Sequence, residues 1–354
     1  MKLKVGVLYG GKSAEHDVSI ASAKNIVRAM DKNKYDIQLI KISKQGVWYW
    51  QKDAEVPTES TNETDEVILS NEGVAASTLV EIGNKLALKK LDVVFSIIHG
   101  TYGEDGSLQG FLEMLDMPYV GPGILGSAVG MDKDLSKRLL IEAGIRVANS
   151  MTLYKWSEQQ PTFEEVTEKL GTPVFMKPCN AGSSVGVSKI RNAEEYAAGL
   201  AEAFRFDTKI LIEEFIDGRE IECAVLGNEH PKASVLGEIL PTQDFYSYDA
   251  KYNDTSSKTQ MPADIPDELT NEIRKEAIKV FQVLGCEGMA RVDFFLRGEE
   301  YFLNEINTIP GFTNISMYPQ LWAYSGIPQT QLMDELINLA LSRAKRKAAL
   351  QFTM

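Results

Sequence analysis

The stretch MARVDFFLRGEEYFLNEINTIPG, residues 289–311, has the pattern of a β-hairpin that carries polar groups on one face. Two runs rich in Val, Phe, Tyr, Leu and Ile flank a polar turn that contains a glycine. Because side chains alternate between the two faces of a strand, Arg291 and Asp293 point the same way, and so do Glu305 and Asn307. A turn centred near residue 299 pairs Asp293 with Glu305 and Arg291 with Asn307.

This face combines two carboxylates, an amide oxygen and a guanidinium beside the bend Pro310-Gly311. Magnesium takes oxygen ligands, typically one or two carboxylates together with substrate phosphates. A neighbouring arginine can bind a phosphate or carboxylate through bidentate hydrogen bonds. A half-exposed hairpin with solvated charges is the alternative, and it is the commoner outcome for any single carboxylate. Four such groups on one face favour a metal–nucleotide site.

Length and composition limit the possible functions. The chain has 354 residues, which predicts two or three domains, and 44% hydrophobic with 25% charged residues is typical of a globular protein. The net charge of −13 argues against nucleic acid as a partner, since binding nucleic acid requires a basic face. It does not exclude a small anionic substrate, because a few local Lys and Arg residues are enough to bind one.

Three further features predict a cytoplasmic protein with no membrane partner. No apolar run approaches the ~18 residues of a membrane span. The first residues, MKLKVGVLYGG, lead directly into strand-like sequence, which is not the pattern of a signal peptide. Cys179, Cys223 and Cys286 are widely spaced, which favours reduced thiols over structural disulfides.

The first part of the chain has the order of an open α/β domain. Strand-like residues 2–9 and 35–42 flank the helical pattern at 19–30, and the apolar run 91–98 is typical of a parallel strand covered on both faces. The polar, acidic residues 52–74 predict a mobile insertion. Gly121-Pro122-Gly123 is a natural domain boundary.

Two further units are predicted after this boundary. The second contains a helix at 133–143, a strand at 173–177, a helix at 193–204 and a strand at 211–215. The third contains a strand at 220–226, a helix at 267–284 and the hairpin, and a helix at 329–347 closes the chain.

Residues 6–13, GVLYGGKS, match the P-loop pattern GxxxxGK[ST]. The first glycine of a P-loop ends a strand, however, whereas Gly6 lies inside the predicted strand. A turn at Gly10-Gly11 that lets the backbone approach a ligand is the better interpretation. Glu15 follows this turn near a helix start, where it either interacts with the helix dipole or binds the ammonium group of a substrate.

A second motif, KPCNAGSSVG at residues 177–186, places Lys177 at the end of a strand and follows it with a loop of small residues. Backbone N–H groups of such a loop, including Gly182, Ser183 and Ser184, can surround phosphate oxygens while the lysine supplies positive charge. A flexible turn is the alternative. A lysine at the end of an apolar strand favours the phosphate site.

Three weaker motifs complete the set. In IEEFIDGRE, residues 212–220, Glu213 and Glu220 could meet an adenine edge and a ribose hydroxyl. In HGTYGEDG, residues 99–106, the acids could orient His99 at the carboxyl end of a strand, where open α/β sheets bind ligands. Residues 242–263 form a long polar segment that predicts a lid, within which Lys251 could meet phosphate and Tyr252 could line a pocket.

Eight stretches in order resemble the ATP-grasp superfamily and, within it, the D-alanine–D-alanine ligases. They are GGKSAEHDVS (10–19), HGTYGEDG (99–106), MDKDLSK (131–137), KPCNAGSSVGV (177–187), IEEFIDGREIE (212–222), FYSYDAKY (245–252), ARVDF (290–294) and NEINTIPGFT (304–313). The resemblance covers nearly the whole chain, from Val5 to about Ile337.

The resemblance implies an α/β protein of three domains. An N-terminal domain with an open parallel sheet spans residues 1–121, and two α+β domains at 122–214 and 215–354 sandwich ATP, with a lid at 242–263. It also implies residue roles. The residues implied to bind ATP are Lys133, Lys177, Ser184, Glu213, Ile216, Glu220 and Lys251. Those implied to hold two Mg²⁺ or Mn²⁺ ions are Asp293, Glu305 and Asn307.

The same resemblance implies the catalytic and substrate-binding residues. Glu15 binds the ammonium of the first D-alanine, Ser183 and Tyr252 hydrogen-bond with Glu15, and Arg291 and the Gly311 amide face the transition-state oxygens. His99, Ser316 and Met317 belong to the substrate site, with Ser316 and Met317 at the second carboxylate. The implied reaction passes through an acyl phosphate, Ala250-Lys251-Tyr252 in the lid favours D-alanine over D-lactate as second substrate, and a homodimer is possible.

Overall fold

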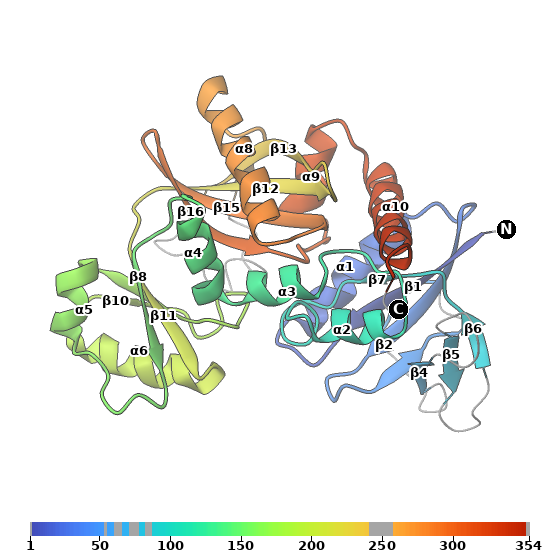
Figure 1. Cartoon of the computed structure of the whole chain (residues 1–354), viewed down its shortest axis with the longest axis horizontal. Helices are drawn as coiled ribbons and strands as arrows, with labels where there is room; N and C mark the ends of the chain where they lie inside the picture. Colours follow the sequence, from blue (N-terminus) through green and yellow to red (C-terminus); the bar gives the residue numbers. More distant parts are fainter. Residues whose placement is uncertain are drawn as a thin grey trace.

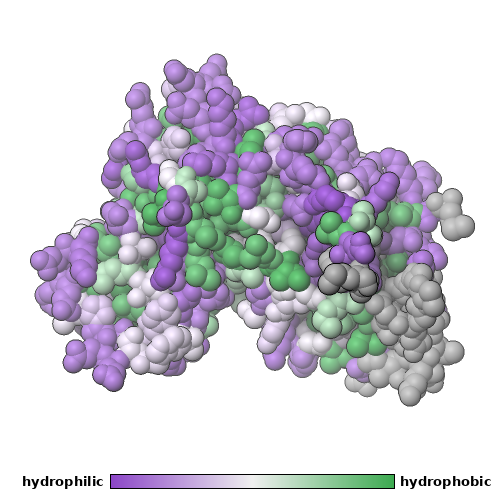
Figure 2. All heavy atoms as spheres, viewed as in Figure 1, coloured by the Kyte–Doolittle hydropathy of each residue, from purple (hydrophilic) through white to green (hydrophobic). Residues whose placement is uncertain are grey.

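The computed structural model describes residues 2–52, 55–59, 66–70, 78–81, 87–240 and 258–351. Figure 1 shows three groups of elements, namely an N-terminal sheet with its helices, a small sheet with α5 (Phe163–Leu170) and α6 (Ala193–Phe206), and a larger sheet with α8 (Asp267–Val283) and α9 (Met317–Tyr324). In Figure 2 hydrophilic residues cover much of this face, while hydrophobic ones gather over α3 (Ile124–Met131) and α4 (Lys133–Glu142). Among the described residues, no helix is both long and apolar enough to cross a membrane.

The N-terminal sheet has the order β3-β2-β1-β7. β1 pairs in parallel with β2 and β7, and β3 pairs antiparallel with β2. Alternate residues of β1 serve two cores, since Val5 and Val7 pack with α1 while Leu8 packs with α2. This confirms the predicted parallel sheet with both faces covered. The bounds are β1 (Leu3–Gly10), α1 (His16–Ala29), β2 (Tyr35–Ile42), β3 (Trp48–Trp50), β7 (Val93–Ser96) and α2 (Ser107–Met114).

A three-stranded antiparallel sheet follows β3, and its first strand corrects the prediction of a mobile insertion for residues 67–70. It contains β4 (Val67–Ser70), β5 (Thr78–Glu81) and β6 (Ala87–Lys90) in the order β4-β5-β6. β4 forms because Val67 and Leu69 lie on one face of an alternating strand and are buried in the same core as Trp50. Residues 53–54, 60–65 and 71–74 of the predicted insertion lie outside the described residues.

The small sheet is antiparallel, with the order β10-β9-β11-β8. Its apolar face carries Met176 and Ile212, which pack against Val166 of α5 and Tyr196 of α6. The helices α3 and α4 connect the N-terminal sheet to it. The bounds are α3 (Ile124–Met131), α4 (Lys133–Glu142), β8 (Ser150–Tyr154), α5 (Phe163–Leu170), β9 (Val174–Pro178), β10 (Ser188–Ile190), α6 (Ala193–Phe206) and β11 (Lys209–Glu214).

The larger sheet is also antiparallel, with the order β14-β13-β12-β15-β16. Along β12, Ile221 and Cys223 pack with α8, whereas Ala224 and Leu226 share a core with α9. The bounds are β12 (Arg219–Gly227), β13 (Lys232–Leu240), β14 (Lys258–Gln260), α8 (Asp267–Val283), β15 (Gly288–Arg297), β16 (Glu300–Asn307), α9 (Met317–Tyr324) and α10 (Gln329–Ala348).

The C-terminal helix α10 returns to the N-terminal sheet (Figure 1). Its Leu332 and Leu336 share a core with Phe95 of β7, and its buried Arg343 donates hydrogen bonds to the carbonyls of Tyr119 and Gly121. The first and last parts of the chain therefore form one packed body. The domain boundaries near 121 and 214 stay predictions.

Candidate active site

The β15–β16 hairpin forms as predicted and brings its polar residues onto one face. Arg291 pairs with Asn307, and Asp293 pairs with Glu305. At the turn, Arg297 pairs with Glu300, which differs by one residue from the register that the predicted turn gives. The shift occurs next to Asp293. A β-bulge at this point adds one residue on β16 and keeps the predicted partners together.

Hydrogen bonds tie these side chains into one cluster. The Arg291 guanidinium donates to both carboxylate oxygens of Asp293, at 2.8 and 2.7 Å, and Asn307 Nδ2 donates to Asp293 Oδ2 at 2.8 Å. Glu222 of the neighbouring β12 lies 2.9 Å from Arg291 Nε. Burial lowers the pKa of Arg291, but Asp293 and Glu222 outweigh burial, so this pKa stays well above its ordinary value.

The donor set at this hairpin suits a hard divalent cation. Asp293, Glu305 and Asn307 offer carboxylate and amide oxygens, which Mg²⁺ and Mn²⁺ prefer, rather than thiolate or imidazole. Asp293 is 9% exposed, so a cation there would be shielded from much of the solvent.

A cleft of about 700 Å³ lies between the small sheet and the larger sheet. This volume falls within the range for small-molecule and cofactor sites. The predicted ATP-binding residues that line it are Lys133, Lys177, Ser184, Glu213, Ile216 and Glu220, and Ser183 and Glu305 line it as well. The structure therefore brings together all the described members of the predicted ATP set.

Two lysines, the buried Lys137 and the half-buried Lys177, bind the carboxylate of Glu213 at the wall of this cleft. Lys177 of β9 contacts one carboxylate oxygen and Lys137 of α4 contacts the other. Burial by itself raises the pKa of Glu213, but the two ammonium groups outweigh burial and bring the pKa down to about 2. Glu213 is therefore charged and positions both lysines.

The glycine-rich loop connects the cleft to the N-terminal domain. Lys133 Nζ donates to the carbonyl of Ala181 at 2.8 Å and lies 3.7 Å from Glu305. Ser183 Oγ donates to Glu15 Oε1, which confirms the predicted contact between these two residues. A Cβ added at Gly182 would lie 3.1 Å from Glu15 Oε2, so this glycine lets the loop approach the carboxylate.

The loop after β7 is fixed by different contacts from those predicted. His99 Nδ1 lies 3.0 Å from the carbonyl of Ile309, and Ser22 Oγ lies 3.3 Å from His99 Nε2. Glu104 accepts hydrogen bonds from the amides of Gly100 and Ile309. Among the described residues, therefore, Ser22 and Ile309 orient His99. The prediction that acids of its own loop do so was wrong, because those carboxylates bind backbone amides.

Burial also shifts the pKa values in this loop. Burial lowers the pKa of His99, and burial together with the Glu15 carboxylate raises the pKa of Glu104 to about 8. His99 is therefore a neutral ring that donates from Nδ1 and accepts at Nε2.

The bend after β16 brings three more of the predicted residues together. A Cβ added at Gly311 would lie 2.8 Å from Ser316 Oγ, so the two residues are neighbours. Ser316 Oγ accepts a hydrogen bond from the Thr313 amide in the loop that leads into α9. Met317 begins this helix with its side chain in the core. Its backbone N–H, at the helix N-terminus, remains suited to an anion.

Two further sequence predictions concern the lid and the P-loop pattern. Lys251 and Tyr252, with residues 242–257 of the predicted lid, lie outside the described residues. The P-loop alternative is not favoured, because Gly6 lies inside β1, Lys12 is exposed, and Gly10 and Gly11 form the turn with positive φ angles of 87° and 101°.

Lys137 and Glu222 belong to the site but were not among the predicted site residues. Lys137 lies four residues after Lys133 on α4, and this spacing places both lysines on one helix face. Glu222 follows Glu220 by two residues on β12, so both share a strand face, and Glu222 pairs with Asp293 across the sheet. Lys137 lies in the motif at residues 131–137 and Glu222 in the motif at 212–222, and their spacing from Lys133 and Glu220 was the signal that could have found them.

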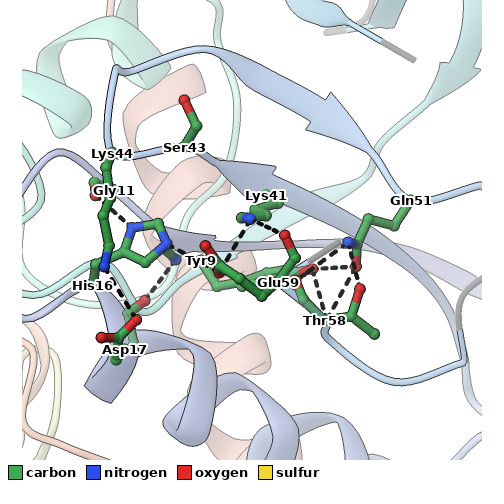
Figure 3. Close-up of polar contacts among 12 residues, drawn as sticks. Tyr9, Gly11, His16, Asp17, Lys41, Ser43, Lys44, Gln51, Thr58 and Glu59 are labelled. Carbon is green, nitrogen blue, oxygen red and sulfur yellow. Dashed lines mark hydrogen bonds and ion pairs between the residues drawn. The ribbon is translucent and has the colours of Figure 1, made fainter. Parts of the chain in front are cut away.

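A second polar cluster lies in the N-terminal domain (Figure 3). His16, Asp17 and Glu59 could together offer ligands to a metal ion. His16 Nδ1, however, binds the carbonyl of Gly11 at 2.7 Å, and the Lys41 ammonium lies 3.1 Å from Glu59. A positive charge thus already balances Glu59, and His16 serves to hold the turn that precedes Glu15.

An antiparallel sheet pair that encloses a lysine-lined cleft, with acids and an amide at one end, defines an ATP-grasp ligase. Comparison with known families gives the particular group. The model of the D-ala D-ala ligase N-terminus matches residues 4–122, and that of the D-ala D-ala ligase C-terminus matches residues 139–338. The chain belongs to the D-alanine–D-alanine ligase family.

Relatives and solved structures agree with this family. The D-alanine–D-alanine ligase of Oceanobacillus iheyensis is 50% identical over 99% of this chain and 98% of its own length. The D-alanine–D-alanine ligase of Coxiella burnetii has a TM-score of 0.85 at 38% identity, covering 98% of this chain and 97% of that one.

Two further solved structures are those of a D-Ala:D-Ser ligase and of a ligase complexed with ATP. VanG D-Ala:D-Ser ligase of Enterococcus faecalis has a TM-score of 0.85 at 36% identity, covering 96% of this chain and 100% of that one. The D-alanine–D-alanine ligase of Bacillus anthracis complexed with ATP has a TM-score of 0.74 at 27% identity, covering 98% and 99%.

Proposed function

We propose that the chain joins two D-alanines into D-alanyl-D-alanine, with release of ADP and phosphate, and so supplies the dipeptide for peptidoglycan. The observation that carries the proposal is the contact between Ser183 and Glu15, which joins the glycine-rich loop of the ATP cleft to the N-terminal domain. Full-length relatives with this activity in their names support it.

ATP would occupy the cleft between the two antiparallel sheets. Lys133 and Lys177 carry the positive charge for its phosphates, with Ser184 in the adjoining loop, and Glu213, Ile216 and Glu220 line the part of the cleft proposed for adenine and ribose. Asp293, Glu305 and Asn307 would hold two Mg²⁺ or Mn²⁺ ions. A bound cation neutralises charge on the phosphate oxygens during transfer.

The proposed mechanism first activates a carboxylate. Glu15 binds the ammonium of the first D-alanine, and the carboxylate oxygen of this substrate attacks the γ-phosphorus, which forms an acyl phosphate and releases ADP. A carboxylate is a poor electrophile, and the phosphate gives it a leaving group. Arg291 and the Gly311 amide donate to the oxygens that gain charge.

The second D-alanine then completes the bond. Its carboxylate is held by Ser316 and by the Met317 amide at the start of α9, and its amine, after losing a proton, attacks the acyl carbon. A tetrahedral species forms, and inorganic phosphate leaves with the C–O bonding electrons. The protein mainly positions reactants, and Lys251 and Tyr252 of the lid would close over the site so that water cannot hydrolyse the acyl phosphate.

The second substrate is the main alternative within the family. A D-alanine–D-lactate ligase is disfavoured by the sequence Ala250-Lys251-Tyr252. D-Serine is a further candidate acceptor, because a structural neighbour at 36% identity is a D-Ala:D-Ser ligase.

The experiment measures ATP-dependent phosphate release with D-alanine, L-alanine, D-alanine plus D-lactate, and D-alanine plus D-serine, with products identified by mass spectrometry. We expect release with D-alanine alone and a D-alanyl-D-alanine product. Predominant D-alanyl-D-lactate or D-alanyl-D-serine from equimolar mixtures at neutral pH would reassign the acceptor. No release under any condition would refute the ligation of D-alanine and leave another acid–amine pair or an inactive relative.

We further propose a cytoplasmic homodimer, with no nucleic acid or membrane partner. ATP and D-alanine are cytoplasmic metabolites. Ile124, Leu125, Leu135 and Leu139 are exposed on α3 and α4, where Figure 2 shows hydrophobic residues, and a second copy would cover them. Sedimentation equilibrium at micromolar concentration tests the dimer, and a mass of 39.3 kDa throughout would refute it.

A further inference from the structure

The backbone bend after β16 is held by side chains of the N-terminal domain. The bend, residues 309–312, reads Ile-Pro-Gly-Phe. Glu104 accepts from the Ile309 amide at 3.0 Å, and His99 Nδ1 lies 3.0 Å from the Ile309 carbonyl. The other end is held in the same way, since the Phe312 amide donates to Ser22 Oγ at 3.2 Å and Asn25 Nδ2 donates to the Phe312 carbonyl at 2.9 Å.

These contacts form a continuous network rather than four separate bonds. His99 must donate from Nδ1 to the Ile309 carbonyl, so Nε2 accepts from Ser22, and the Ser22 oxygen in turn accepts from the Phe312 amide. Asn25 accepts from Arg28 through its other amide atom, at 3.2 Å, which fixes its orientation. Ser22, Asn25 and His99 are all buried.

The network leaves one backbone donor of the bend unused. Pro310 has no N–H group. The Gly311 N–H has no hydrogen-bond partner among the described residues. Gly311 is only partly buried, beside Ser316. Both residues that flank Pro310-Gly311 are thus bound through their amide and their carbonyl, and the Gly311 amide alone remains available to a substrate.

We propose that Ser22 and Asn25 of α1, together with Glu104, are positioning residues that aim the Gly311 amide at the oxygen that gains charge during ligation. This deepens the proposed function and rests on it. The N-terminal domain thereby positions a donor that belongs to the hairpin of the C-terminal domain. A fixed donor lowers the barrier because it needs no reorganisation when the charge develops.

Ser22 has a matched control on the same helix. Ser19 lies one turn earlier and is equally buried, accepts from the Gly10 amide at 2.9 Å and donates to the Ile97 carbonyl at 2.6 Å. Ser22→Ala and Ser19→Ala each remove one buried hydroxyl with two partners. Only Ser22→Ala releases the Phe312 amide.

The test measures kcat, the KM for ATP and the melting temperature of the full chain for Ser22→Ala, Asn25→Ala, Glu104→Gln and Ser19→Ala. We expect kcat to fall about tenfold in each of the first three, since misplacing a catalytic group by 1 Å can cost ~100-fold. The KM for ATP should stay within about twofold, because the ATP cleft lies elsewhere. Ser19→Ala should lose melting temperature as Ser22→Ala does while keeping kcat within about twofold.

A phosphinate that mimics the tetrahedral species gives a second readout. Its affinity should fall about tenfold in Ser22→Ala, in parallel with kcat, since transition-state mimics report such donors. Equal kcat in Ser22→Ala and Ser19→Ala, or unchanged phosphinate affinity, would overturn the inference. An inactive wild-type chain would instead refute the proposed function, so the two failures are distinct. Glu104→Gln keeps the test decisive if Ser22→Ala does not fold.

Discussion

At the scale of single residues, charge pairs decide how the site is built. Asp293 accepts from Arg291 and Asn307, while Arg291 also binds Glu222, so one guanidinium is shared between two carboxylates. Burying such groups is costly unless they are paired, and the pairing therefore offsets this cost while it orients the oxygen atoms of the hairpin.

Asp293→Asn should reduce turnover at least ~100-fold, because a neutral amide stabilises a divalent cation and the transferring phosphate far less than a carboxylate does. The measurement is a titration of activity with MgCl₂, which should not restore the activity of the variant. Removing divalent ions with EDTA should abolish the activity of the wild type, and adding Mg²⁺ or Mn²⁺ should restore this activity. Glu300→Gln, an exposed acid of the same hairpin, is the control and should keep its activity. Normal turnover in Asp293→Asn would contradict the metal assignment.

Ser183 and Ser184 both adopt the left-handed backbone region, with φ angles of 52° and 58°. Side chains are strained there, so Ser184→Gly should raise the free energy of unfolding by about 0.5–1 kcal/mol. If the backbone amide of Ser184 binds phosphate, the KM for ATP should hardly change. Ser183→Gly relieves the same strain but removes the hydroxyl that binds Glu15, so its KM for D-alanine should rise. Chemical denaturation and steady-state kinetics check both, and a raised ATP KM in Ser184→Gly would show that the hydroxyl is needed.

Glu213 makes stability depend on acid pH. Its pKa is about 2 in the folded chain against 4.5 for an ordinary glutamate. A depressed carboxyl pKa stabilises the fold above the unfolded value and loses this contribution as pH falls from about 4.5 towards 2. The loss should be on the order of 3 kcal/mol. Unfolding in urea at pH 5, 4 and 3 should show a steeper decline for the wild type than for Glu213→Gln, and parallel curves would refute the coupling.

At the scale of elements, the β15–β16 hairpin shows how a local irregularity preserves function. Continued from Arg297 and Glu300 at the turn, a regular ladder would place Asn304 opposite Asp293. The bulge next to Asp293 shifts this register by one residue, so Glu305 lies there instead. Because side chains alternate, the same shift decides whether Glu305 faces the cleft or the opposite side of the sheet.

Gly298 allows the tight turn of this hairpin. Its φ angle is 62°, and a Cβ added there would meet nothing within 4 Å. Gly298→Ala should therefore lower the free energy of unfolding by about 1–2 kcal/mol through backbone strain alone. Turnover at 25 °C should be unchanged, because the turn lies at the end of the hairpin away from Asn307. Thermal unfolding measures the effect, and a variant as stable as the wild type would contradict the strain argument. Gly298→Asn, which tolerates this region, is the control.

At the scale of the whole molecule, α10 holds the N-terminal and C-terminal domains together. Arg343 is 4% exposed and stacks 4.3 Å from the centre of the Tyr119 ring while it donates to the carbonyls of Tyr119 and Gly121. The segment between the N-terminal sheet and α3 is thus fixed by the last helix of the chain. The same body carries the contacts of Ser22 and Asn25 to Phe312.

Arg343→Met should therefore destabilise the chain by about 3 kcal/mol, since it leaves two buried carbonyls without donors. ATP affinity should stay within about twofold, because the cleft is distant from α10. Denaturant unfolding and binding of ATP to the same samples check both parts. Lys347 lies on the same helix as Arg343 and forms an exposed ion pair with Glu113 of α2. Lys347→Met removes this pair and should cost less than about 1 kcal/mol. Equal losses in the two variants would refute the role of burial.

Local patterns in the sequence determined most elements and the members of the site. Alternation in 289–311 predicted the hairpin face, the apolar runs predicted the parallel sheet, and the ordered motifs indicated the family, because these signals depend on neighbouring residues alone. Only the tertiary structure decided which distant groups meet. The contacts of Lys137 and Lys177 with Glu213, of Glu222 with Arg291, and of α1 with residues 309–312 all depend on how separate elements pack. Their partners lie far apart in the chain, and no local period records such contacts.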